Sequence, residues 1–311
     1  MLIGVAGKKR SGKTLLSNFL CARYGAVKVP FAGSLKGLLT PSLGVLAWRP
    51  QMCKEARLAL QSVGQGCRDI DEDAFVKLWS CAAPLISGKV VVPDVRYANE
   101  FMMIKERGGK VIGLRARKTE DATDIHPSEL IPLELSDIVI EVDDPYEERQ
   151  EIFRQADEFL RSEGYEPSGE PPLIYIASNI TNKKGFEDSF KELAWKVKEA
   201  GLEPLTPTDV PKGVWYEGLE REPVKELAKR LVAGDLRTIA SAHGVLAYFD
   251  APSVGGAMEV LAAALMEKSV AIVVPLNLLY HPWLHAFGKV FWDDVEGAID
   301  WLQSCLLLKS T

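Results

Sequence analysis

Residues 7–14 read Gly-Lys-Lys-Arg-Ser-Gly-Lys-Thr and directly follow an apolar run at 2–6. A run of this length is typical of a buried parallel strand, and apolar residues at helical spacing continue over 14–20. The stretch between them fits G-x-x-x-x-G-K-[ST], a pattern whose backbone N–H groups surround a phosphate. We therefore predict a strand, a phosphate-binding loop and a helix in succession; the alternative is a glycine-rich turn without a ligand.

The loop predicts a site for ATP and Mg²⁺. Gly7 and Gly12 allow tight backbone turns, and the following helix adds its positive end. Lys13 is expected to reach the β- and γ-phosphates, and the Thr14 hydroxyl to bind Mg²⁺. The residues assigned to ATP and phosphate binding are Gly7, Lys8, Arg10, Ser11, Gly12, Lys13 and Thr14.

The bulk properties of the chain limit its class. Its 311 residues are enough for two ordinary domains. The net charge of −6 argues against a nucleic-acid partner, and the lack of an 18-residue uncharged apolar stretch argues against a membrane partner. Because the phosphate-loop pattern starts at residue 7, we expect no signal peptide and a cytoplasmic location. The five cysteines lack C-x-x-C spacing, so we expect reduced thiols and no metal site of their own.

Strands and helices alternate through the first half. Apolar runs at 26–30, 89–94, 110–115 and 137–142 are separated by helical patterns at 51–64, 73–82, 97–107 and 145–161, with Gly64 expected near the end of the first of these. This alternation predicts a parallel sheet. Asp94 ends one run and Arg96 follows it, so both are predicted to be catalytic, with Asp94 holding Mg²⁺ directly or through water. The alternative is a surface ion pair with a helix cap.

A polar segment at 116–127 follows Arg115 and is predicted to be a mobile loop over the phosphates, where arginines could stabilise a transferring phosphoryl group. Arg115 is assigned to the substrate, and the alternative for each arginine here, favoured when it is taken singly, is a solvated side chain.

Five segments of the first half, taken together and in order, carry a family resemblance. They are 7–13, 24–36, Arg57-x-x-x-Gln61-x-x-Gly64, Val92-Pro-Asp-Val-Arg96 with Glu100, and 124–129. In these segments residues 1–161 resemble the deoxynucleoside monophosphate kinases of tailed bacteriophages. The resemblance implies transfer of the ATP γ-phosphoryl group to a deoxynucleoside 5′-monophosphate. It also implies that Lys36, Arg57 and Gln61 lie on the substrate side.

Residues 162–172 concentrate Gly, Pro, Ser and Glu, a composition that favours an extended connector. A second strand-first pattern then runs over 173–311 without another phosphate loop. Its predicted strands are 173–177, 202–206, 244–250 and 269–275, and its predicted helices are 184–199, 220–241, 255–267 and 293–307. The domains are therefore 1–161 and 173–311, joined by a linker at 162–172.

Two carboxylates and a phenol are predicted to meet in the second half. Glu259 lies one turn into a helix that starts at a glycine pair, and Asp235 precedes it by 24 residues near the end of another helix. Tyr175 is expected at the end of the first strand. Such a group suits glycosidic chemistry, in which one carboxylate attacks the anomeric carbon and the other handles the proton of the departing base. The alternative is a solvated helical glutamate.

The segments that carry a second resemblance are Ile174-Tyr-Ile-Ala, Gly234-Asp-Leu-Arg-x-Ile, Gly244-Val-Leu-Ala and Ser253-Val-Gly-Gly-Ala-Met-Glu259. They are similar to the nucleoside 2-deoxyribosyltransferase superfamily. The resemblance implies that Glu259 is the nucleophile, that Asp235 is the acid serving the base, and that Tyr175 contacts the nucleophile. It also implies a homodimer or higher homo-oligomer, because related hydrolases complete their sites across subunits.

Ser253 separates the branches of this superfamily. Transferases acting on free nucleosides tend to carry Asp there, whereas the 2′-deoxynucleoside 5′-phosphate N-hydrolases carry Ser, which can donate a hydrogen bond to a phosphate. Ser253 and Gly255 are therefore assigned to substrate binding, together with Asn179 in the loop after the first strand. That loop lacks the arginine found in the hydrolase branch.

The fold class that follows is α/β with two parallel-sheet three-layer domains, a P-loop kinase-like domain before a Rossmann-like deoxyribosyltransferase domain. The expected function is bifunctional: phosphorylation of a deoxynucleoside monophosphate, and cleavage or exchange of its base. The expected partners are deoxynucleotides and ATP.

One alternative function is a kinase with a non-catalytic nucleotide-sensing domain, and a more remote one is an interaction protein in which both sites are relics. The residues read as packing or interface positions are His243, His281, His285, Trp283 and Trp292.

Overall fold

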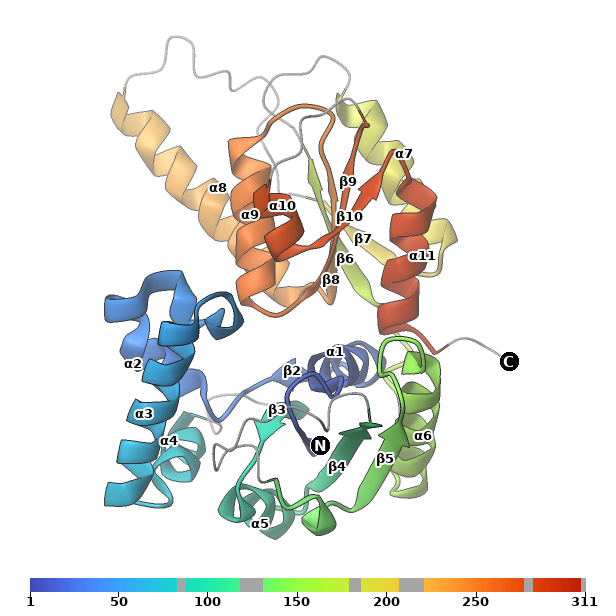
Figure 1. Ribbon diagram of the computed structural model, residues 1–311. Coiled ribbons are helices and arrows are strands. Elements are labelled where there is room, and N and C mark those ends of the chain that lie inside the picture. Colours follow the sequence, from blue (N-terminus) through green and yellow to red (C-terminus); the bar gives the residue numbers. More distant parts are fainter. Residues whose placement is uncertain (83–87, 118–130, 179–185, 207–220, 277–281, 309–311) are drawn as a thin grey trace. The chain divides into compact units, whose positions relative to one another are not determined.

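The computed structural model describes residues 1–82, 88–117, 131–178, 186–206, 221–276 and 282–308 (Figure 1). The chain divides into two compact units, Met1–Gly169 and Glu170–Leu307. Each contains a parallel sheet with helices on both faces, which confirms the predicted α/β class with two parallel sheets.

Within the described residues, the first unit folds around five parallel strands in the order β2-β3-β1-β4-β5. They are β1 (Leu2–Gly7), β2 (Val27–Lys28), β3 (Val90–Val95), β4 (Lys110–Ala116) and β5 (Ile138–Val142). The helices are α1 (Lys13–Tyr24), α2 (Gly33–Leu43), α3 (Lys54–Ile70), α4 (Ala74–Ala82), α5 (Ala98–Glu106) and α6 (Arg149–Ser162), with 3-10 turns at Gly44–Ala47, Pro50–Met52 and Leu133–Leu135. The chain leaves β1 toward β2 and leaves β3 toward β4. The connections that follow these two neighbouring strands therefore run in opposite directions, and open α/β sheets bind ligands beside such a pair of strands.

The first sheet is covered on both faces, which explains its continuously apolar strands. Helices α1 and α6 pack together on one face, where the rings of Phe19 and Phe153 stack with centroids 4.1 Å apart. Helices α4 and α5 contribute Trp79, Phe101 and Ile104 to the core on the other face. The order of the strands and the two covered faces together place the loop after β1 beside the end of β3.

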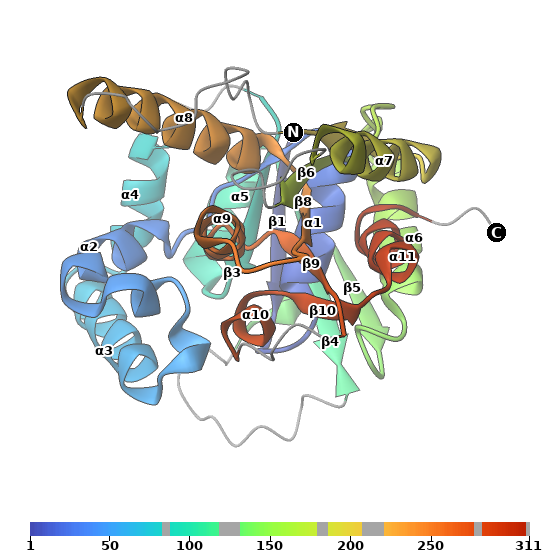
Figure 2. The ribbon, with the colours of Figure 1, turned by 90° about the horizontal axis from the view of Figure 1, so that it is seen from above.

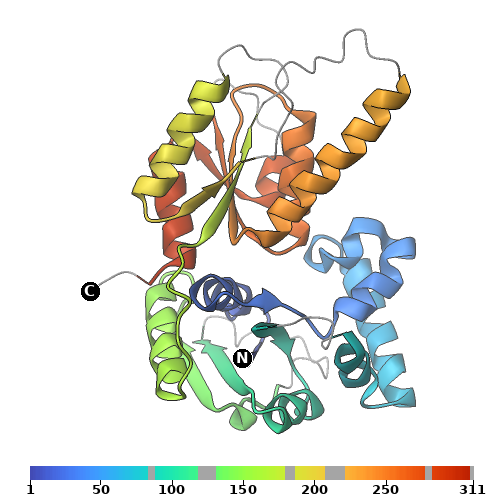
Figure 3. The same cartoon turned by 180° about the vertical axis from the view of Figure 1, so that it is seen from behind.

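Helices α2, α3 and α4 form a small group beside the β2 edge of the sheet (Figure 3). The core between them contains Leu35, Leu60 and Phe75. The prediction that Gly64 lies near a helix end was wrong, since α3 continues through it to Ile70. Gly64 is buried, and a Cβ atom there would lie 3.1 Å from a methyl carbon of Leu35. The glycine therefore allows α3 to pack closely against α2.

The described part of the second unit has five parallel strands in the order β10-β9-β8-β6-β7. They are β6 (Leu173–Ser178), β7 (Glu203–Leu205), β8 (Gly244–Tyr248), β9 (Ser269–Val274) and β10 (Lys289–Trp292). The helices are α7 (Phe186–Glu199), α8 (Arg221–Ser241), α9 (Val254–Leu265), α10 (Pro282–Phe287) and α11 (Val295–Leu306). The sequence patterns did not predict α10 and β10, which are short.

Helices α7 and α11 cover one face of this sheet, and α8, α9 and α10 cover the other (Figures 1 and 2). Alternation along β6 sends Tyr175 and Ala177 into the core beneath α8, α9 and α10. The connections diverge between β6 and β8, so a crevice is expected where these strands end. None of the described helices has the length and apolar character that crossing a membrane requires.

Candidate functional site

Three predicted side chains of the second unit converge on the α8/α9 face of its sheet. The hydroxyl of Tyr175 on β6 donates a hydrogen bond to Oε1 of Glu259 on α9, with 3.1 Å between the oxygens. Asp235 on α8 lies close enough for its charge to act on both. Tyr175 is fully buried and occupies the middle of β6 rather than its end. The predicted meeting of two carboxylates and a phenol is therefore present in the fold.

The electrostatics of this trio favour protonated acids. Burial, and then the negative charge of Asp235, raise the pKa of Glu259 to about 7 against the opposing effect of the Tyr175 hydrogen bond. Burial also raises the pKa of Asp235, and burial with the nearby carboxylates raises the pKa of Tyr175. Among the described residues, Oε2 of Glu259 and Oδ1 of Asp235 are buried without a hydrogen-bond partner. Each of these two atoms therefore keeps an unused capacity to accept a hydrogen bond.

The amino end of α9 lies in the same unit. Ser253 caps the helix by accepting a hydrogen bond from the Gly256 N–H at 3.1 Å. A Cβ atom at Gly256 would lie 2.2 Å from the Phe249 ring, whereas one at Gly255 would meet no atom within 4 Å. Gly256 thus allows close packing, and Gly255 leaves space beside the cap. The Ser253 hydroxyl hydrogen is not used by the cap and can be donated to a ligand.

The loop between β1 and α1 has the backbone of a tight turn. Gly7 and Gly12 have φ values of 152° and 90°, which side chains disfavour, and Arg10 also has a positive φ of 65°. The Lys13 ammonium group donates hydrogen bonds to the carbonyl oxygens of Gly7 and Lys8. Within the described residues, the buried Ser11 hydroxyl has no partner, and Thr14 is exposed at the start of α1. The donors and the orphaned hydroxyl fit a phosphate ligand.

Asp94 lies at the end of β3, one position before the residue that pairs with Ala6 of β1. Its Oδ1 accepts a hydrogen bond from the Phe31 N–H at 2.8 Å, and its Oδ2 accepts one from the Ala32 N–H at 2.9 Å. Burial raises the pKa of this carboxyl group. Both oxygens already accept hydrogen bonds from the two residues just before α2. To bind Mg²⁺, directly or through water, Asp94 would use the remaining lone pairs of these oxygens.

The other assigned residues of the first unit lie on several elements. Lys36 is on α2 with its ammonium group 5.7 Å from the centre of the Trp48 ring, and Arg57 and Gln61 are half-buried on α3. Arg115 on β4 pairs with Glu141 on β5. Asn179 and most of the loop expected at 116–127 lie outside the described residues, as do His281 and the side chain of Trp283.

Sequence reasoning did not assign a role to Glu100 or Arg68. Glu100 is 2% exposed at the third position of α5, where Oε2 accepts hydrogen bonds from the Arg96 and Tyr97 N–H groups at 2.7 and 3.2 Å. Burial and then the charge of Asp94 raise the pKa of Glu100 to about 7. A glutamate three residues after a helix cap commonly accepts a hydrogen bond from the backbone of the cap, so the contact between Glu100 and the Tyr97 N–H could have been predicted from the sequence.

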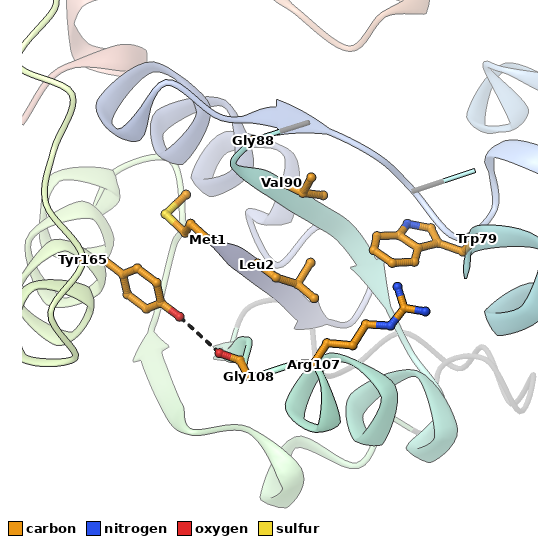
Figure 4. A pocket seen from close by; sticks show the side chains of 8 residues that line it. All are labelled: Met1, Leu2, Trp79, Gly88, Val90, Arg107, Gly108 and Tyr165. Atoms are coloured by element: carbon orange, nitrogen blue, oxygen red, sulfur yellow. Dashed lines mark hydrogen bonds between the residues drawn. The ribbon is translucent and has the colours of Figure 1, made fainter. Parts of the chain in front are cut away.

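A hollow of about 440 Å³ lies at the opposite, amino end of β1 and β3 (Figure 4). Its lining residues are Met1, Leu2, Trp79, Gly88, Val90, Arg107, Gly108 and Tyr165. No assigned site residue lines it. Nor do the described residues contain a group of three or more His, Cys, Asp or Glu side chains arranged for a metal ion.

His243 has a structural role. Its Nδ1 accepts a hydrogen bond from the Leu173 N–H at 2.9 Å, and burial followed by the charge of Lys268 lowers its pKa to about 4. The neutral ring therefore joins the start of β6 to the end of α8.

No protein-family model and no curated protein matches this sequence. Among solved structures, it is similar to a 2-deoxyribosyltransferase from the psychrotolerant bacterium Bacillus psychrosaccharolyticus, with 16% identity and a TM-score of 0.34 over 45% of this chain and 99% of that chain. It is also similar to the CMP N-glycosidase of Clostridium botulinum, with 15% identity and a TM-score of 0.28 over 42% of this chain and 98% of that chain. Likeness at this level carries no substrate or activity over to this chain.

Proposed function

We propose that the second unit cleaves or exchanges the base of a deoxynucleoside 5′-monophosphate, with Glu259 as nucleophile. The observation that supports this most directly is the hydrogen bond from Tyr175 to Glu259 Oε1, which leaves the unpartnered Oε2 for attack beside Asp235. A carboxylate held through one oxygen, with a second acid nearby, suits a double-displacement reaction at an anomeric carbon.

In the proposed reaction, Glu259 Oε2 forms a bond to the anomeric carbon while the bond from that carbon to the base breaks. The bonding electrons leave with the base, which takes a proton from Asp235. Water, or the nitrogen of a second base, then attacks the same carbon and releases Glu259, and the proton of the attacking group passes to Asp235. Tyr175 orients the carboxylate and stabilises its charge.

The nucleotide preference is supported by the amino end of α9. Ser253 can donate its hydroxyl hydrogen, and Gly255 leaves room for a phosphate at the positive end of the helix. An aspartate at position 253 would repel this group. The resemblance of residues 253–259 to the N-hydrolase branch points to the same substrate class.

We propose that the first unit transfers the γ-phosphoryl group of ATP to a deoxynucleoside 5′-monophosphate. The turn from Gly7 to Gly12 would hold the phosphates, and Lys13 would leave the carbonyl groups it now contacts to bind them. Mg²⁺, which Thr14 and Asp94 would hold, neutralises phosphate charge when bound. The resemblance of residues 7–13 and 92–100 to phage kinases supports this assignment.

A single screen tests both activities. The protein is incubated with each common deoxynucleoside monophosphate, with and without ATP and Mg²⁺, and free base and nucleoside diphosphate are separated by chromatography. Base release without an added acceptor base indicates hydrolysis, and release only with one indicates exchange. Glu259→Gln should lower base release by at least about 100-fold, whereas Glu192→Gln, an exposed change on α7, should not.

If Glu259→Gln leaves every activity unchanged while nucleotide binding to the second unit alters the kinase rate, that unit is a sensor rather than an enzyme. If no deoxynucleotide is phosphorylated or cleaved, both proposals are wrong.

A further inference from the structure

The last turn of α3 is joined to the first turn of α5 by a largely buried ion pair. Arg68 Nη2 lies 3.5 Å from Glu100 Oε1, and the two side chains are 18% and 3% exposed. The guanidinium group of Arg68 also lies 3.9 Å from the centre of the Tyr97 ring and 4.5 Å from that of the Phe75 ring. Arg68 is therefore held between two aromatic rings and one carboxylate, a geometry that fixes the direction of its helix.

The second oxygen of Glu100 is fixed at the same time. Oε2 accepts the N–H groups of Arg96 and Tyr97, which follow β3 directly. Glu100 thus connects the chain segment beside the phosphate loop with the end of α3. The carboxylate of Asp94, six residues earlier, makes the corresponding connection to the start of α2 through Phe31 and Ala32.

The face of α3 that carries Arg68 is the face assigned to substrate. Arg57, Gln61 and Arg68 are separated by four and seven residues, so at about 100° per residue they lie within about 40° of one another around the helix. Any rotation of α3 that moved Arg68 would also move Arg57 and Gln61. Gly64, on the same face, packs against Leu35 of α2 and leaves little freedom for sliding.

We propose that Glu100 and Arg68 are positioning residues for the phosphoryl acceptor, which set Arg57 and Gln61 at the correct distance from the phosphate loop. This inference rests on the proposed kinase activity of the first unit. Neither residue needs to touch the substrate. Loss of the pair should therefore weaken use of the deoxynucleoside monophosphate and leave use of ATP nearly unchanged.

The test compares steady-state constants for both substrates in the full-length chain. Arg68→Gln and Glu100→Gln should raise KM for the deoxynucleoside monophosphate by at least about 10-fold and change KM for ATP by less than about two-fold. Glu100→Gln keeps an oxygen for the Arg96 and Tyr97 N–H groups, so it separates the ion pair from the helix cap. Asp69→Asn, an exposed change on the same helix, is the control and should alter neither constant.

The outcomes separate this inference from the activity on which it rests. Wild-type protein that phosphorylates no deoxynucleoside monophosphate would overturn the kinase proposal and this inference together. An active wild type whose two variants show unchanged KM for the acceptor, or equal changes for both substrates, would overturn this inference alone. Circular dichroism and thermal unfolding identify a variant that has lost its fold. Arg68→Lys then takes its place: it keeps the charge but loses the planar contacts with Tyr97 and Phe75, so it should raise KM for the acceptor by a smaller factor and still leave KM for ATP unchanged.

Discussion

The hydroxyl of Tyr175 and the carboxylate of Glu259 share a hydrogen bond of 3.1 Å across 84 positions of sequence. This contact lowers the pKa of Glu259 relative to burial alone, and so favours the ionised form that the proposed reaction requires. It also leaves Oε2 as the carboxylate oxygen without a hydrogen-bond partner. The proposed chemistry of the second unit depends on this relationship.

Replacing Tyr175 by Phe should therefore lower base release by about 10–100-fold and move the acidic limb of the pH–rate profile to higher pH, because Glu259 loses a donor that stabilises its charge. The measurement is kcat/KM for base release across the pH range on both sides of about 7. A lower rate with an unmoved acidic limb would mean that Tyr175 does not act through the charge of Glu259.

Glu259→Gln should change how stability depends on pH. The pKa of Glu259 is about 7 in the folded protein, against an ordinary value of 4.5. The folded state therefore keeps a proton that the unfolded state releases, so this contribution to stability is present below the lower value and is lost as pH rises through the higher one. Between about pH 5 and pH 8 the wild type should lose on the order of 1–3 kcal/mol relative to the Gln variant. Urea unfolding of both proteins at the two pH values measures this difference. An unfolding free energy that changes equally with pH in both would contradict it.

Two neighbouring glycines of α9 provide a matched pair. Gly256→Ala places a Cβ atom 2.2 Å from the Phe249 ring and should cost about 1–3 kcal/mol of stability. Gly255→Ala meets nothing within 4 Å and should change stability by less than about 1 kcal/mol, in the stabilising direction.

Gly255→Ala should instead weaken nucleotide binding, because its methyl group enters the space beside the Ser253 cap. Thermal unfolding and calorimetric titration with a deoxynucleoside monophosphate separate the two effects. Equal destabilisation by both variants would show that α9 does not pack as described.

Asp157 joins α6 to α1, and its removal should destabilise the first unit. Its carboxylate is 4% exposed and accepts hydrogen bonds from Arg23 at 3.0 and 3.1 Å and from the Tyr24 hydroxyl at 2.9 Å. Asp157→Ala leaves a buried phenol and a guanidinium group without this partner and should cost about 2–3 kcal/mol. Glu158→Ala, the next residue, removes only an exposed pair with Arg154 and should cost less than about 0.5 kcal/mol. Urea unfolding of both variants provides the comparison.

Lys13→Ala should lower ATP-dependent phosphorylation by at least about 100-fold without affecting base release, because it removes the cation assigned to the β- and γ-phosphates. Both products are measured in one reaction mixture. Lys198→Ala, an exposed change on α7, is the charge control. Retained phosphorylation in Lys13→Ala would exclude the phosphate-loop assignment.

The sequence alone determined which segments are strands and helices wherever the apolar pattern was long. It placed the turn at 7–14, the helices that carry Asp235 and Glu259, and the serine before α9. These features are local, since period and turn chemistry act over a few residues. Short elements such as α10 and β10 were not predicted, because six and four residues are too few to show a helical or strand period.

The tertiary structure decided what the side chains do. In the folded chain both oxygens of Asp94 accept hydrogen bonds from the residues before α2. Gly64, expected near a helix end, lies inside α3 where it packs against Leu35, and Arg68 pairs with Glu100. The tertiary structure also brought Tyr175 to Glu259. Each of these contacts depends on which strands are neighbours in the sheet and on which face a helix covers. No local pattern carries that information, because the free energy that selects a strand order comes from burial shared by residues far apart in the chain.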